Sequence, residues 1–66
     1  MDERTFDLVA LTARVRPSSR AREAARLYLL HGLTQVEIAA KLGLTQATVS
    51  QSVRRIVDTY RTMKRL

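Results

Sequence analysis

The stretch LGLTQATVSQSVRRI, from Leu42 to Ile56, contains a single glycine, Gly43, inside an otherwise helical hydrophobic pattern. Because glycine tolerates positive φ angles without steric cost, its position here separates two helices. A turn of about three residues between helices that cross at roughly 90–120° needs such a residue. The pattern therefore predicts a helix, a tight turn and a second helix in this part of the chain.

The helix before the turn begins with a capping box. In Thr34-Gln35-Val36-Glu37, the Thr hydroxyl and the Glu carboxylate each satisfy a backbone N–H group of the other residue. Ala39, four residues before Gly43, lies at the inner side of the crossing, where a larger side chain would push the helices apart. An ordinary helical hairpin is the alternative, but the capping box, the small residue and the glycine together favour a helix-turn-helix at about 34–56. Its small core is expected to contain Ile38, Leu42, Leu44 and Val49.

Two further helices precede this motif, so we expect an all-α fold. The first begins after Asp2, a favourable N-cap, and carries apolar residues as far as Val15. The stretch Pro17-Ser18-Ser19 ends that helix and supplies a serine cap for the next one. The second helix is apolar around most of its circumference near its end and should be the central core helix, with Gly32 as its left-handed C-cap.

The fourth helix is long for so small a chain. It starts after its N-cap, Thr45, and its apolar positions continue almost to Leu66. We predict one domain, residues 1–66: a small four-helix domain that contains a helix-turn-helix, with an extended C-terminal recognition helix. A chain of 66 residues has only a small core, so its stability should be modest unless a second chain adds buried surface.

The charge of the chain favours an anionic partner. Twelve Lys and Arg against six Asp and Glu give +6, and eleven of the basic residues lie beyond Arg4. Such an excess on a short chain indicates DNA, RNA or an acidic membrane surface, with solubility alone as the alternative. No apolar run approaches the ~20 residues of a spanning helix, and the acidic start MDERTFD lacks the features of a secretory signal. We therefore expect a cytoplasmic protein that does not bind membranes.

The composition disfavours an enzyme. There is no Cys, which excludes disulfides and thiolate metal sites, and His31 is the single His. No pair of acidic residues has a spacing suited to catalysis, and His31, next to Gly32, fits the end of a helix better than chemistry. We expect no catalytic residues, no metal, no cofactor and no small-molecule ligand.

The polar residues in the first half of the fourth helix suit a DNA groove. In a helix-turn-helix the second helix lies in the major groove, with its N-terminal residues facing base edges. Gln can pair with adenine and Arg with guanine, while Ala and Thr methyl groups can contact thymine. No Asp or Glu, which phosphates would repel, occurs between Glu37 and Asp58. A solvated face is the alternative for each residue. The candidate base-reading residues, on the side opposite Val49 and Val53, are Thr45, Gln46, Ala47, Ser50, Gln51 and Arg54.

Contacts to the phosphates should come from residues around this helix. The candidates are Gln35, Lys41, Thr48 and Arg55. Helix N-termini favour phosphate as well, because their free N–H groups and dipole attract anions. A separate group of Arg residues could touch the flanking DNA backbone or solvate the outer face of the second helix: Arg14, Arg16, Arg20, Arg22 and Arg26.

The fourth helix also carries the pattern of a helix–helix seam. Val49, Val53, Ile56, Tyr60 and Met63 follow one another at steps of 4, 3, 4 and 3, the spacing of a coiled coil. The alternative is that the early members belong to the core of one chain and only the late ones are free. We expect a homodimer built partly from the last helix and the first helix, with Val57, Tyr60, Met63 and Phe6 at the interface.

The stretch GLTQVEIAAKLGLTQATVSQSVRRIVDTY resembles the helix-turn-helix of the TrfB/KorA family of plasmid-encoded transcriptional repressors. The layout is also similar to that of very short repressors encoded beside anti-CRISPR genes, and phage repressors share its Gln-x-x-x-Ala-x-x-x-Gly frame. The resemblance implies an operator-binding repressor that acts as a symmetric dimer, and we expect it to control its own promoter through a palindromic operator. In the plasmid family the recognition helix uses two positions that correspond here to Gln46, where a family representative carries Arg, and Gln51.

Two other functions fit parts of the sequence. The stretch LTQVEIAAKLGLTQATVSQSVRRI also resembles region 4 of sigma factors, which would imply promoter recognition within a larger complex, although a chain starting at Met1 argues against it. Outside DNA binding, a helical adaptor for an acidic partner is the alternative. Binding to duplex DNA distinguishes the adaptor from the other two.

Overall fold

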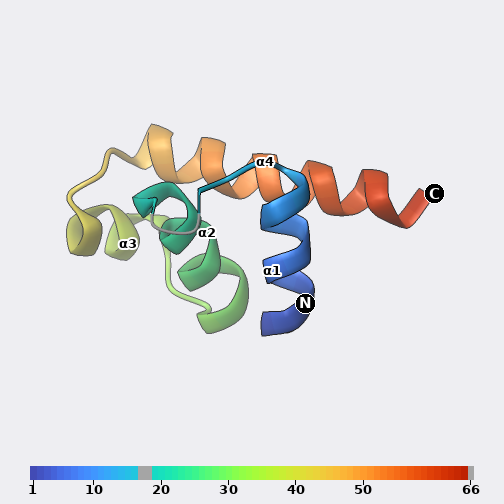
Figure 1. Cartoon of the computed structure of the whole chain (residues 1–66). Coiled ribbons are helices and arrows are strands. Elements are labelled where there is room, and N and C mark those ends of the chain that lie inside the picture. The colour runs from blue at the N-terminus through green and yellow to red at the C-terminus, as the bar shows by residue number, and fades with distance from the viewer. Residues whose placement is uncertain (17–18, 66) are drawn as a thin grey trace.

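The computed structural model describes residues 1–16 and 19–65, which form four α-helices (Figure 1). Helix α1 covers Glu3–Thr12, α2 covers Arg20–His31, α3 covers Gln35–Leu42 and α4 covers Gln46–Arg65. No strand occurs within the described ranges, and the predicted all-α four-helix class is confirmed. Pro17 and Ser18, predicted to separate the first two helices, and Leu66, predicted near the end of the last, lie outside these ranges.

Each helix starts at a short polar residue whose side chain accepts a hydrogen bond from the backbone three residues later. The accepting caps are Asp2 (2.8 Å), Ser19 (3.0 Å), Thr34 (3.2 Å) and Thr45 (3.1 Å). At α3 the Glu37 carboxylate also accepts from the Thr34 backbone N–H at 3.1 Å, so the predicted capping box is confirmed. These bonds satisfy N–H groups that have no partner within the helix, and they place the four helix starts where the sequence indicates.

The predicted turn at Gly43 is present. Its φ angle is +67°, and only Gly43, Leu44 and Thr45 separate the end of α3 from the start of α4. Gly32, at the end of α2, has a φ of +70° and is the predicted left-handed C-cap.

The first helix ends earlier than predicted. The residue in the left-handed conformation that stops it is Arg14, and the sequence did not indicate this because the residue is not a glycine. Arg14 has a φ of 60°, and its N–H donates to the Leu11 carbonyl while the Val15 N–H donates to the Ala10 carbonyl, both at 3.0 Å. This is the Schellman arrangement of a helix C-terminus. The prediction that Val15 belongs to the first helix is therefore wrong.

Helix α2 lies between the other three helices and packs against all of them (Figure 1). Its buried residues are Ala24, Ala25 and Leu27, so it is the central helix that the sequence predicts. The largest side chains with almost no exposed surface come from the surrounding helices and are Phe6, Val9, Ile38, Val49 and Ile56. The small side chains of α2 let the other helices approach closely, which compensates for the short chain.

Two ion pairs join α1 to α2 at the surface. Arg22 pairs with Asp7, and Arg26 donates to Glu3 at 2.8 Å. Arg22 also lies over the Phe6 ring, 5.6 Å from its centroid. Two members of the arginine group therefore contact α1 within the chain. Exposed pairs of this kind each contribute under about 1 kcal/mol, so their main effect is on orientation.

The turn generates a first prediction. Gly43→Ala should lower the free energy of unfolding by about 1–2 kcal/mol, because a Cβ at positive φ is strained. No heavy atom lies within 4 Å of the Cβ position, so the loss would come from the backbone alone. Gly43→Asn should cost less, since Asn tolerates this conformation. Gly32→Ala is the parallel case, with a φ of +70° and the same open space, and should show a similar loss. Urea unfolding measures all three, and an unchanged Gly43→Ala protein would contradict the turn.

The capping box generates a second prediction, on pH. The hydrogen bond from the Thr34 backbone N–H lowers the pKa of Glu37 below its ordinary value of 4.5. Because the pKa in the folded chain is the lower one, the stabilisation is complete above 4.5 and is lost as the pH falls through the folded value. Glu37→Gln should therefore destabilise the protein at neutral pH and much less in acid. Urea unfolding at both pH values tests this, and a difference that does not change with pH would contradict it.

Candidate nucleic-acid interface

Helix α4 has one buried side and one polar side in its first half. Val49, Val53 and Ile56 are buried in the core. Ala47, Gln51 and Arg54 are exposed and, at spacings of four and three residues, form a single stripe on the opposite side. Burial of the first set therefore decides the direction in which the second set points.

All six predicted base-reading residues are exposed. Thr45 and Gln46 lie at the start of α4, and Ser50 lies on the flank of the stripe formed by Ala47, Gln51 and Arg54. The Thr45 hydroxyl is partly occupied, because it accepts from the Thr48 backbone N–H. The six residues are thus all exposed but do not share one side of the helix. Thr45 and Gln46, four residues before Val49 and seven before Val53, are on the side of the buried residues and are exposed at the start of α4.

The stripe changes character at Asp58. This exposed residue follows Arg54 by four positions and therefore continues the same side of α4. A carboxylate there would be repelled by DNA phosphates, so the part of α4 suited to a groove ends before Asp58. Beyond it the helix continues to Arg65 and projects past α1 (Figure 1).

The four predicted phosphate-contacting residues have different environments. Lys41 is exposed in the last turn of α3, and Gln35, at the first position of α3, is half-buried. Thr48 is half-buried, and its hydroxyl lies 2.9 Å from the Thr45 hydroxyl. Arg55 turns toward α1, where its Nη2 donates to the Ala13 carbonyl at 2.7 Å. Sequence reasoning missed this last contact, which joins residues 42 positions apart.

The predicted dimer residues need one correction. Phe6 has no exposed surface, because Phe6, Val9, Ala10 and Ala13 form the inner face of α1 and its cap, so the prediction of Phe6 at an interface is wrong. Val57, Tyr60 and Met63 are half-buried and pack against the core. The sequence did not single out the residues that α1 does expose, Leu8 at 55% and Leu11 at 72%. Their spacing of three residues was the available signal.

Other kinds of site are not indicated. Within residues 1–16 and 19–65, no group of three or more His, Asp or Glu side chains is arranged to hold a metal ion. None of the four helices, over the same part of the chain, is long and apolar enough to cross a membrane.

The fold and this surface define a small all-helical domain whose exposed helix carries uncharged and basic groups suited to nucleic acid. Residues 1–65 match the family model KORA, described as TrfB plasmid transcriptional repressor. The chain belongs to this family, a family of transcriptional repressors and not a class of enzymes, which supports DNA-binding repression. Comparisons with curated proteins and with solved structures found no match.

Proposed function

We propose that the chain is a helix-turn-helix repressor that binds a palindromic operator as a homodimer, with the first half of α4 in the major groove, and that it controls its own promoter. The observation that carries this proposal is the exposed stripe of α4, free of carboxylates up to Asp58 and opposite a fully packed side. The short turn at Gly43 and the membership of a repressor family support it.

The six candidate base-reading side chains have complementary roles in reading bases. Gln51 and Gln46 can each offer a donor and an acceptor to adenine, and Arg54 can donate twice to guanine. Ala47 and the Thr45 methyl group suit the methyl group of thymine, and Ser50 can donate or accept. Because these side chains, apart from Arg54, are short, the helix can approach the base edges closely.

Gln35 and Lys41 are proposed to hold α3 against the DNA backbone. Gln35 stands at the start of α3, where the positive end of the helix dipole favours an anion. Lys41 contributes an exposed ammonium group near the turn. Such contacts fix the position of the recognition helix and carry no sequence information themselves.

A second copy of the chain is proposed to cover the outer face of α1. Leu8 and Leu11 leave this face apolar, and the C-terminal part of α4 beside it carries the half-buried Val57, Tyr60 and Met63. The acidic groups of α1 and its cap, Asp2, Glu3 and Asp7, are already bonded within the chain, so the apolar side chains carry this proposal. In a two-fold pair, α4 of each copy would lie on α1 of the other, so the same surface is used twice.

The distinction between residues proposed to read bases and residues proposed to contact phosphates gives a third prediction. Gln51→Ala should weaken binding to the preferred operator by about 1–3 kcal/mol, because a paired contact to a base is lost. The loss on random duplex DNA should be much smaller. Lys41→Ala, as the phosphate-contacting counterpart, should weaken binding to both DNAs by similar factors and reduce the salt slope by about one unit. Titrations of both variants on both DNAs at several salt concentrations measure these effects.

Folding of both variants is checked by circular dichroism, and both changed residues are exposed, so neither variant should lose its core. An equal loss for Gln51→Ala on the two DNAs, or none, would show that α4 does not read bases there. If the unaltered chain fails to bind duplex DNA at any salt concentration, the adaptor for an acidic partner becomes the better account.

The proposed interface gives a fourth prediction. Leu11→Asp should convert the dimer to a monomer and weaken operator binding, because a buried carboxylate would face an apolar surface. Leu11 is 72% exposed in the single chain, so its replacement leaves the core intact. Val36→Asp is the matched control: Val36 is 60% exposed, lies on α3, and should leave the dimer unchanged. Sedimentation equilibrium reports the result, and a wild-type monomer that binds one asymmetric site would contradict the dimer.

A further inference from the structure

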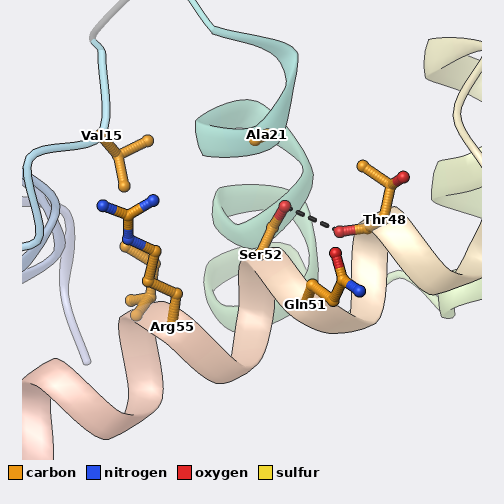
Figure 2. Close-up of a pocket in the computed structure, with 7 residues that line it drawn as sticks. Val15, Ala21, Thr48, Gln51, Ser52 and Arg55 are labelled. Atoms are coloured by element: carbon orange, nitrogen blue, oxygen red, sulfur yellow. Dashed lines mark hydrogen bonds between the residues drawn. The ribbon is translucent and has the colours of Figure 1, made fainter.

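A hollow of about 250 Å³ lies on one flank of α4, next to the connection between α1 and α2 (Figure 2). Thr48, Gln51, Ser52 and Arg55 line it from α4, and Val15 and Ala21 line it from the other side. Thr48, Ser52 and Arg55 are centred roughly 100° around the helix from the stripe of Ala47, Gln51 and Arg54. The hollow is therefore beside the base-reading face and meets it at Gln51.

Arg55 is held in place at the wall of this hollow. Its Nη2 donates to the carbonyl of Ala13, the C-cap residue of α1. A guanidinium has five N–H donors, so four remain for a further partner. Because the carbonyl already orders the long side chain, less conformational freedom would be lost when an anion binds.

The rest of the lining does not oppose an anion, although its hydroxyl groups are already bonded. The Ser52 hydroxyl donates to the Thr48 carbonyl at 2.8 Å and so is not a free donor. The Thr48 hydroxyl is bonded to the Thr45 hydroxyl and points away from Arg55 (Figure 2), so it is not a donor into the hollow either. The Gln51 amide is exposed at the edge. None of the described residues that line the hollow is acidic, and the exposed Arg14, Arg16 and Arg20 are adjacent in sequence to the lining residues Val15 and Ala21.

We propose that the hollow binds one phosphate group of the DNA backbone, with Arg55 as its main ligand. This inference rests on the proposed function, because α4 in a major groove has a row of phosphates on each side, about 12 Å apart. The flank with the hollow faces one of these rows. A phosphodiester offers several acceptor oxygens to the fork of N–H groups that Arg55 presents.

The test uses the selected operator with single methylphosphonate linkages, each of which removes the charge of one phosphate. For the unaltered protein, one linkage in each half-site should weaken binding about tenfold, the effect of losing a charge-assisted hydrogen bond. For Arg55→Ala, that same linkage should have no further effect, while linkages elsewhere keep theirs. This coupling assigns the phosphate to Arg55, which a merely structural role could not do.

A second variant tests the hollow without removing the hydrogen bond between Arg55 and Ala13. Ala21→Glu places a carboxylate on the opposite wall, in the first turn of α2, where negative charge favours the helix. It should weaken operator binding about tenfold or more. His31→Glu makes the same charge change on the exposed last residue of α2 and should leave affinity within about twofold. Equal affinities of the two variants would overturn the proposal.

The outcomes separate the hollow from the function on which it rests. If no linkage couples to Arg55 while Gln51→Ala still distinguishes operator from random DNA, the hollow is not a phosphate site and the proposed function stands. Absence of binding to any duplex overturns both. A third arm titrates the free protein with sodium phosphate by NMR: saturation at submillimolar concentration without coupling to any linkage would indicate a site for a free phosphorylated ligand and overturn the assignment to DNA.

Discussion

Burial of Val49, Val53 and Ile56 fixes the rotation of α4 about its own axis. When these three side chains are in the core, the residues on the opposite side of the helix must be exposed. Here those residues are Ala47, Gln51 and Arg54. The surface that we propose to face DNA is thus determined by packing on the opposite side of the same helix. A change that loosened this packing would alter recognition without touching any residue of the stripe.

Contacts at the C-terminus of α1 and along its length hold α4 and α2 in position. At its C-terminus, Arg14 in the left-handed conformation stops the helix and leaves the Ala13 carbonyl free to accept from Arg55. This hydrogen bond joins α4 to the C-terminal end of α1. Along its length, pairs with Arg22 and Arg26 tie α1 to α2. The position of α4 therefore depends on contacts from α1 as well as on the turn at Gly43.

Local rules accounted for the helices, and tertiary contacts accounted for what the sequence did not reveal. The N-caps, the capping box at Thr34 and the turn at Gly43 depend on residues within a few positions of one another, so they could be predicted. The left-handed conformation of Arg14 could not, because Arg disfavours it and only the surrounding hydrogen bonds reveal it. The exposed positions on α4 were predictable from helical spacing, whereas the contact of Arg55 with Ala13 requires the packed chain. For Phe6 the sequence could not distinguish an interface from a core, because an aromatic residue fits both. Its burial in the core follows from the residues packed around it.

Selection of bound sequences from a pool of random duplex DNA tests the central claim most directly. If α4 reads bases as part of a two-fold pair, the selected pool should share a palindrome whose half-sites are about one helical turn apart. A pool with no enrichment over the starting DNA would contradict sequence-specific recognition.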